Sequence, residues 1–289
     1  MTQNPIAIVG PGAVGGLLAV LLERSSVDVV AVARAESVHA IQQNGLSMRS
    51  AMFGDGTSSV RASTEIPVGA RVIIATKAFA VGDVVASLAR AEPREVVSLL
   101  NGIEHMDILR AQLIGVPLAG ATIAVESTRE AATVIDHRSG FLRLVVPEHA
   151  KDFSLVEDLR AAGLEVTVGG DEREVLWAKL RFLAPMALLT AFWREPLGAA
   201  LEHDQAMTDA LLAEVAQVAS ADGLATSSGQ LADILAGFPT GMRSSLQVDI
   251  QGGNANELDN IGGAIIRRAT AHEISTPVVE RVVTALSRP

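Results

Sequence analysis

The stretch that decides the fold is Ile6–Gly15, which reads IAIVGPGAVG. Four apolar residues, typical of a buried strand, run directly into the pattern Gly-x-Gly-x-x-Gly, and a helical repeat of leucines follows from Leu17 to Leu22. Strand, glycine turn and helix in this order are what a dinucleotide-binding βαβ unit requires. The alternative that the residues leave open is a structural glycine turn in another kind of α/β protein.

Each glycine of this pattern has a physical role in such a unit. Gly10 permits the tight turn, Gly12 has no side chain to block the approach of a pyrophosphate to the backbone, and Gly15 allows the helix to pack closely on the strand. The pyrophosphate is expected on the free N–H groups at the start of the helix, at Ala13 and Val14, where the helix dipole is positive. These five residues are the predicted core of a cofactor site.

The second strand of the unit predicts which dinucleotide binds. It covers Val27–Ala33 and ends at Arg34, about twenty residues past the glycines, where NAD enzymes usually carry an Asp or Glu that accepts from the ribose 2′-OH. An Arg at this place suits a 2′-phosphate through charge-assisted hydrogen bonds. Glu36 is the counter-argument, because NAD would be preferred if Glu36 faced the ribose. We predict NADP (NADPH) as the cofactor, with NAD as the alternative.

The composition excludes several kinds of partner. The chain has 289 residues, is 49% hydrophobic and 19% charged, and has a net charge of −10 with no basic patch, which argues against nucleic acid. The longest apolar run, Leu183–Trp193, is too short for a membrane span and contains Pro185. No secretory signal is recognisable, so the predicted location is cytoplasmic. The expected partner is a small-molecule substrate, and a homodimer is compatible with the chain.

Missing residue types exclude several chemistries. There is no Cys, so disulfides, thiolate nucleophiles and cysteine-bound metals are ruled out. There is no Tyr, which removes the Tyr/Lys pair that short-chain dehydrogenases use as an acid. The six His are scattered without metal-ligand spacing, so no metal is predicted. If the chain transfers a hydride, its acid is a Lys, a His or a carboxylic acid.

Strand and helix patterns alternate through the first 170 residues, which predicts a mostly parallel, doubly wound sheet. Further strands are predicted at Arg71–Ala75, Glu95–Leu99, Leu118–Val125, Val134–His137, Leu142–Val146 and Leu164–Val168. Helices are predicted at Val81–Arg90, His105–Leu113 and Phe153–Ala161. Leu46–Ala62, with Gly54-Asp55-Gly56 at its centre, is interpreted as a hairpin inserted in the sheet.

The character of the sequence changes after Gly169-Gly170, because every later pattern is helical. We therefore predict an α/β protein with two domains. A Rossmann-type dinucleotide-binding domain covers residues 1–170, and an all-helical C-terminal domain that carries substrate and catalytic residues covers residues 171–289.

Two polar residues follow apolar strands of the first domain. Lys77 comes after Val72–Thr76, and Asn101 comes after Val96–Leu100. Because ligands of open α/β sheets bind outside the carboxyl ends of the strands, both are expected to face the ligand. The alternative is an ordinary solvated loop Lys and a turn formed by Asn101-Gly102.

Lys179 lies on the apolar face of a predicted helix, Glu172–Ala184. Its helical neighbours are apolar, and no carboxylate is placed to pair with it along the helix. One interpretation is a Lys whose stem packs while its ammonium reaches water. The other is a partly desolvated ammonium whose pKa moves toward neutrality, where it makes a competent acid. The pattern alone does not decide between them.

Two further positions have simple structural explanations. Glu257 follows Asn254-Ala255-Asn256 at the start of a predicted helix, Glu257–Thr270, and a first-turn Glu after an Asn cap stabilises a helix. Ser244-Ser245 precede another helical stretch and are explained equally well as caps.

The chain resembles a known family in its glycine turn, in Arg34 and in segments along its whole length: Thr76-Lys77-Ala78, Leu100-Asn101-Gly102, Trp177-Ala178-Lys179-Leu180, and Ser244-Ser245…Asp249-Ile250…Glu257-Leu258-Asp259. The family is ketopantoate reductase (2-dehydropantoate 2-reductase). The resemblance implies a Rossmann domain that binds NADPH and a helical domain that closes over the substrate. It implies hydride transfer from nicotinamide C4 to a 2-oxo carbon, with a proton delivered to the nascent alkoxide.

The resemblance also implies roles for single residues. Lys179 would be the general acid, Glu257 would orient the substrate hydroxyl, and Ser245 would hold the substrate carboxylate. Lys77 and Asn101, with Arg34, would contact NADPH or line its site.

The chain departs from the family pattern on the substrate side. Three positions that usually carry Asn hold Leu183, Ala187 and Leu197 here. The helical face beside Lys179 would therefore be apolar, and Pro185 is expected to kink the helix. Asn254 is a candidate to supply an amide from another element, as is Asn256.

We therefore predict an NADPH-dependent reductase of a 2-oxo acid, most concretely 2-dehydropantoate 2-reductase, which converts ketopantoate to pantoate in pantothenate biosynthesis. Two alternatives remain: a reductase of a bulkier, less polar carbonyl compound, and a non-catalytic NADP-binding sensor.

Overall fold

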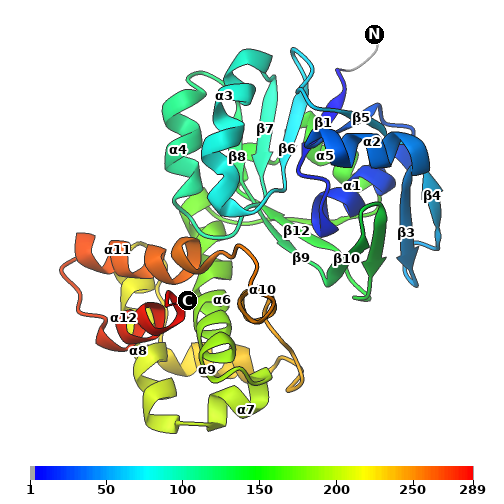
Figure 1. The fold of residues 1–289 in the computed structure, drawn as a ribbon. Helices are drawn as coiled ribbons and strands as arrows, with labels where there is room; N and C mark the ends of the chain where they lie inside the picture. The colour runs from blue at the N-terminus through cyan, green and yellow to red at the C-terminus, as the bar shows by residue number, and fades with distance from the viewer. Residues whose placement is uncertain (1–3, 289) are drawn as a thin grey trace. The chain divides into compact units, whose positions relative to one another are not determined.

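A computed structural model describes residues 4–288, and these divide into two compact units (Figure 1). The first unit holds the chain up to Leu100 together with His105–Val175. The second holds the four residues Asn101–Glu104 and the chain from Leu176 onward. The sequence predicts a change of domain after residue 170, and it gives no sign that Asn101–Glu104 belongs with the second unit.

A six-stranded parallel sheet forms the centre of the first unit. Its strand order is β5-β2-β1-β6-β7-β8, the order of a doubly wound dinucleotide-binding sheet, which confirms the predicted fold class. The strands are β1 (Ile6–Val9), β2 (Val29–Val32), β5 (Arg61–Ser63), β6 (Arg71–Ile74), β7 (Glu95–Ser98) and β8 (Leu118–Gly120).

Helices cover both faces of this sheet, which explains why its inner strands consist mostly of continuous apolar residues. All residues of β1, β2 and β6 are buried, as expected of parallel strands that are covered on both faces and read as continuous apolar runs. Figure 1 shows α3 and α4 together beside β7 and β8. The helices of this unit are α1 (Ala13–Arg24), α2 (Ala35–Asn44), α3 (Val81–Ala91), α4 (His105–Gln112) and α5 (Ser154–Ala161), with short 3-10 turns η1 (Ala78–Ala80) and η2 (Glu148–Ala150).

Two smaller sheets correct the sequence interpretation. The predicted hairpin is present, but its strands β3 (Leu46–Ser50) and β4 (Gly56–Ser58) lie in a separate sheet with β11 (Val134–His137) and β10 (Ser127–Ala131), and α1 packs between this sheet and the central one. The hairpin is therefore not inserted in the central sheet. Periodicity finds strands, but the sheet that a strand joins is decided by tertiary packing.

The predicted strand Leu118–Val125 is in fact two strands. Its first part is β8, at the edge of the central sheet. Its second part is β9 (Thr122–Ala124), which pairs with β12 (Arg143–Val146) in a three-stranded sheet completed by β13 (Glu165–Val168).

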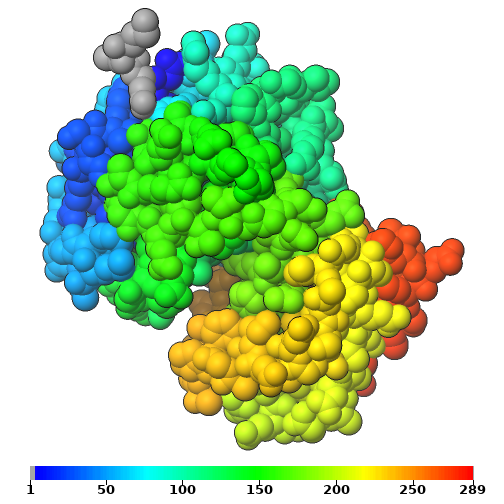
Figure 2. Space-filling view, turned by 180° about the vertical axis from the view of Figure 1, so that it is seen from behind, coloured from blue at the N-terminus to red at the C-terminus, as the bar shows by residue number. Residues whose placement is uncertain are grey.

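The second unit is helical, as predicted. Figure 2 shows it from behind, where the yellow and gold atoms of α8 and α9 form a large part of the face in view. Its elements are α6 (Glu172–Trp193, from Leu176), α7 (Leu197–Glu202), α8 (Gln205–Ala221), α9 (Ser228–Ala236), α10 (Ser245–Gln251), the π-helical turn η3 (Asp259–Gly263), α11 (Ala264–Ala271) and α12 (Pro277–Leu286).

Helix α6 is longer than predicted, because it does not end at Ala184 but continues through Pro185 to Trp193. A Pro inside a helix removes one hydrogen bond and its ring crowds the preceding turn, which together cost about 3 kcal/mol. The residues on either side of Pro185 are buried, and their packing offsets this cost. By length and composition alone α6, which is longer than the apolar run Leu183–Trp193 within it, could cross a membrane. However, 72% of its most apolar window is buried inside the protein, as in the core helix of a helical domain.

Candidate active site

The glycine turn after β1 has the close packing that its sequence predicts. Gly10 has φ +88°, and a Cβ there would lie 2.6–2.9 Å from atoms of Thr76. A Cβ on Gly15 would lie 2.2 Å from the carbonyl oxygen of Gly10. Both distances are shorter than any real Cβ contact, so these two positions are glycine for steric reasons.

Gly12 differs from its neighbours, because a Cβ there would meet nothing within 4 Å. It is the residue before α1, and among residues 4–288 no acceptor is found for the backbone N–H groups of Ala13 and Val14. Open space beside free donors at the positive end of a helix is what an anion such as a pyrophosphate requires. These residues therefore fit the dinucleotide that the sequence predicts.

This contrast gives a matched pair of variants. We expect Gly15→Ala to destabilise the first unit, because its Cβ collides with a backbone oxygen that cannot move freely. We expect Gly12→Ala to leave the free energy of unfolding nearly unchanged, because the site is open and φ is −79°, but to weaken dinucleotide binding. Thermal unfolding and cofactor titration of both variants measure this. Equal losses of stability would contradict the assignment.

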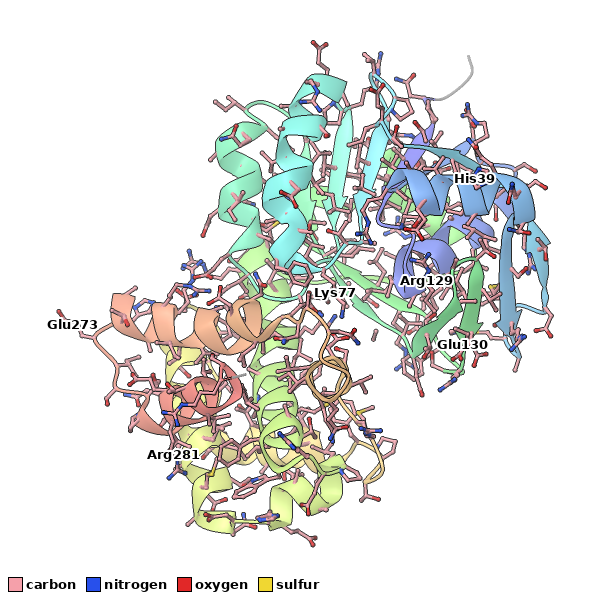
Figure 3. The ribbon with its side chains drawn as sticks, in the orientation of Figure 1. His39, Lys77, Arg129, Glu130, Glu273 and Arg281 are labelled. Carbon is pink, nitrogen blue, oxygen red and sulfur yellow. The ribbon has the colours of Figure 1, made fainter. Side chains whose placement is uncertain are left out.

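The two basic residues predicted for the cofactor lie at the carboxyl ends of β2 and β6, the two strands that flank β1 in the central sheet. Arg34 follows β2, is exposed, and is the N-cap residue of α2, whose first turn contains Glu36. Lys77 follows β6, is partly buried, and directly precedes the turn η1 (Figure 3). No hydrogen bond or ion pair of the Arg34 side chain is found within the described part of the chain, so its guanidinium is available to a ligand.

Lys179 lies on α6 in the second unit and is partly exposed. Burial lowers its pKa to about 8, and the nearby Glu257 carboxylate opposes this by raising the pKa. A Lys with a pKa near 8 can give up its proton near neutral pH, which an ordinary surface Lys does not do. Helix α6 places no carboxylate beside Lys179, and the carboxylate near its ammonium is that of Glu257, which lies outside this helix.

Glu257 is only 4% exposed and lies just before the π-helical turn η3. The Asn101 side chain donates a hydrogen bond from Nδ2 to its Oε2 at 2.9 Å. The sequence predicts Asn101 for the cofactor, but the structure brings it to the carboxylate, and no pattern could show this across 156 residues of chain. The predicted helix Glu257–Thr270 is also corrected, since it begins as a π-helical turn at Asp259 and becomes α11 at Ala264.

A buried carboxylate holds α6 two residues before Lys179. The Trp177 indole is fully buried and donates from Nε1 to Oδ2 of Asp222 at 2.7 Å. The other oxygen of Asp222 lies 3.0 Å from Nε2 of His272. Because Trp177 precedes Lys179 by two residues, this network anchors the part of α6 that carries Lys179.

Ser244 and Ser245 have different surroundings. Ser244 is buried, accepts from the backbone N–H of Gln247 as the N-cap of α10, and its hydroxyl lies 2.7 Å from that of Thr190 on α6. Ser245 is exposed, and within residues 4–288 no hydrogen bond of its hydroxyl is found. The cap explanation therefore applies to Ser244, and the Ser245 hydroxyl is available to a ligand. No pattern in the sequence indicates the contact between Thr190 and Ser244.

The apolar positions beside Lys179 are mostly interior. Leu183 is 9% exposed, whereas Ala187 and Leu197 are each 1% exposed, so Leu183 has the most surface to offer a substrate. Asn254 is exposed on the loop after α10, where its side-chain amide is accessible. No group of three His, Asp or Glu side chains that could hold a metal occurs in the part of the chain that the structure describes.

Comparison with known proteins identifies relatives along the whole chain. The family model described as Ketopantoate reductase PanE/ApbA matches residues 6–151, and the model of the C-terminal part matches residues 171–288. The 2-dehydropantoate 2-reductase of Caulobacter vibrioides is 28% identical over 294 residues, which cover 99% of both chains. That of Escherichia coli O157:H7 is 30% identical over 225 residues, or 75% of this chain and 73% of the relative.

Solved structures agree with these sequence matches. A ketopantoate reductase of the same family from Ralstonia eutropha JMP134 superposes with a TM-score of 0.88 at 27% identity, covering 98% of this chain and 97% of the other. D-mandelate dehydrogenase, in a ternary complex with NADH and anilino(oxo)acetate, superposes with a TM-score of 0.85 at 19% identity, covering 98% and 97%. At that identity the second likeness shows a common fold alone.

Proposed function

Because the chain belongs to the ketopantoate reductase family, whose members are oxidoreductases, we propose that it reduces a 2-oxo acid with NADPH, and that ketopantoate is the leading single substrate. The observation that carries the proposal is the grouping of Lys179, Glu257 and Asn101 in one unit. It consists of an ammonium with a lowered pKa, a buried carboxylate and an amide that fixes that carboxylate. A non-catalytic sensor would not need such a group.

Each side chain has one task in this reaction. The Lys179 ammonium donates a proton to the substrate oxygen as negative charge develops there. The Glu257 carboxylate, fixed by Asn101, accepts from the substrate hydroxyl and keeps Lys179 protonated up to a higher pH than burial alone would allow. The exposed Ser245 hydroxyl donates to the substrate carboxylate. Bound NADPH supplies the hydride.

Binding of that cofactor is assigned to the first unit. The free N–H groups of Ala13 and Val14 would bind the pyrophosphate, and the unpaired Arg34 guanidinium would bind the 2′-phosphate. Lys77, at the end of β6, would line the same site. The cytoplasm, where NADPH is available, is the proposed location.

The pH dependence follows from Lys179. Reduction needs its protonated form, so with a pKa of about 8 we expect kcat/KM to be constant at lower pH and to fall about tenfold per unit above pH 8. Oxidation of the product should show the opposite trend, because it needs the neutral amine. Initial rates in both directions between pH 6 and 10 measure this. A reduction rate that stays flat to pH 10 would contradict the role of Lys179.

The same group has a predictable effect on stability. Its pKa in the folded protein lies below the ordinary value of 10.5, so the unfolded chain binds more protons between about pH 8 and 10.5. The partly buried ammonium therefore reduces stability in full below pH 8, and this penalty disappears as the pH rises through that window.

The apolar residues on α6 bear on the choice of substrate. Leu183 stands where relatives are expected to carry an amide, so a hydroxylated substrate such as ketopantoate would find one hydrogen bond fewer there. We expect Leu183→Asn to raise kcat/KM for ketopantoate relative to an apolar 2-oxo acid, by at most about tenfold. Steady-state kinetics of both substrates measure the ratio. If the unmodified enzyme already prefers ketopantoate strongly, Asn254 and Asn256 become the next residues to substitute.

Consumption of NADPH across a panel of 2-oxo acids tests the proposed function. The panel contains ketopantoate, its analogue without the hydroxyl, and aliphatic and aryl 2-oxo acids. Turnover of ketopantoate supports the first proposal, and turnover of apolar members alone supports a reductase of a less polar carbonyl compound, which Leu183 favours. NADPH binding without turnover of any member would support the sensor instead.

A further inference from the structure

The four residues Asn101–Glu104 are set apart from the chain around them. The chain leaves the first unit after Leu100 and returns to it at His105, and between these points it is part of the second unit. Within these four residues there is no helix or strand, so the segment depends on contacts with the rest of the second unit to stay in place. The contacts that hold the segment therefore decide where Asn101 lies.

Both ends of the segment are held by polar contacts, and its middle is held by close packing. At one end Asn101 donates to Glu257 at 2.9 Å. At the other end the Glu104 carboxylate accepts from Arg267, from Nη2 at 2.7 Å and from Nε at 3.0 Å. Between them Gly102 has φ +87°, and a Cβ there would lie 2.5 Å from the backbone oxygen of Asn260.

Arg267 is itself fixed by the π-helical turn η3. Its Nη1 donates to Oδ1 of Asp259 at 2.7 Å, and its Nη2 donates to the backbone oxygen of Asp259 at 2.9 Å. Gly263 makes room for this pair, because a Cβ there would lie 2.4 Å from the Asp259 carboxylate and 3.0 Å from Nη1. The guanidinium thus has a set orientation, in which one edge faces Glu104.

The contacts of Arg267 with Glu104 and Asp259 fix the orientation of these side chains, and they add little to the free energy of unfolding. Isolated ion pairs at the surface contribute little, and the Arg267 side chain is 45% exposed. A guanidinium that makes two hydrogen bonds to one carboxylate and is braced by a second has a defined geometry, however. η3 begins two residues after Glu257, so the same short stretch of chain carries Glu257 and fixes Arg267.

We propose that Arg267 and Glu104 form a clamp that positions Asn101 against Glu257, and thereby holds this carboxylate in the orientation that the substrate requires. The two clamp residues are positioning residues, since they act through Asn101. This inference rests on the proposed function for its kinetic consequence, but the clamp itself can be tested without turnover.

The first test separates kcat from KM. We expect Arg267→Ala to lower kcat about tenfold and to leave KM for NADPH unchanged, because misplacement of a substrate-orienting group affects the reaction and not cofactor binding. Arg267→Lys should recover part of the loss, since it keeps the charge without the two parallel bonds. The matched control is Arg281→Ala on α12, an exposed Arg of the same unit (Figure 3), which should resemble the unmodified enzyme. Equal kcat values for Arg267→Ala and Arg281→Ala would overturn the proposal.

The second test shows whether the clamp acts through Asn101. In an enzyme that already carries Asn101→Ala, Arg267→Ala should change kcat by less than twofold, because the group that it positions is gone. If the two losses multiply instead, Arg267 acts by another route and the proposal is wrong. Glu104→Gln, which removes the charge and keeps the shape, repeats the cycle if Arg267→Ala folds poorly.

The third test does not depend on activity. Amide hydrogen exchange of the peptide that contains residues 101–104 should be faster in Arg267→Ala than in the unmodified protein, and unchanged in Arg281→Ala. If the protein turns over no carbonyl substrate but this peptide exchanges faster, the proposed function fails and the clamp stands. If exchange is unchanged, the clamp fails whatever the activity.

Discussion

Lys179→Ala is expected to reduce kcat by about 10²–10⁴, the usual contribution of a positioned general acid. The ammonium is the partly buried donor beside Glu257, and burial lowers its pKa to about 8, which suits proton donation near neutral pH. Cofactor affinity should be unchanged, because Lys179 and the glycine turn belong to different units. Steady-state kinetics with the best substrate of the panel, together with an NADPH titration, measure both quantities.

Lys151→Ala provides the matched control for this variant. Lys151 is an exposed lysine of the first unit that pairs with Glu148 at 2.6 Å, so its loss should leave kcat near the unmodified value. Glu257→Gln is the companion variant, and it should lower kcat/KM without unfolding the protein. If Lys179→Ala retains nearly full turnover, another group is the acid and the proposed mechanism is wrong.

Arg34→Ala should weaken NADPH binding by about 1.5–3 kcal/mol, the scale of a hydrogen bond to a charged group, and leave NADH binding nearly unchanged. The guanidinium follows β2 at the carboxyl end of the sheet, is exposed, and is free to pair with a 2′-phosphate that NADH lacks. Fluorescence titration of the protein with each cofactor measures the two affinities separately.

Arg61→Ala is the control for Arg34. Arg61 is also exposed and lies on β5 of the same sheet, but it begins its parallel strand and so lies at the amino end, where it pairs with Asp28. Its loss should affect neither cofactor. Equal weakening of NADPH and NADH in Arg34→Ala would place this arginine away from the ribose, and Glu36 would then be the residue to examine for NAD preference.

The sequence by itself determined the dinucleotide fold and made Lys179 a candidate acid, with a lysine that only packs its stem as the open alternative. The stretch Ile6–Gly15 is enough to predict the dinucleotide fold, because its strand, turn and helix are consecutive in the sequence. In the structure, Gly10 and Gly15 indeed leave no room for a Cβ. Lys179 is a candidate because helical periodicity alone places it among apolar neighbours. Contacts between residues close in sequence can be inferred from spacing.

Only the tertiary structure decided which groups surround Lys179 and where the short strands belong. Glu257 and Asn101 are 156 residues apart, and each has an adequate local explanation as a helix-start carboxylate and a turn amide. Their hydrogen bond exists because Asn101–Glu104 is part of the second unit, held there by Glu104 and Arg267. Likewise β3 and β4 form the predicted hairpin but join β11 of a separate sheet. Hydrogen bonds between distant segments depend on how whole helices and strands pack against one another. Sequence periodicity predicts the helices and strands but not this packing.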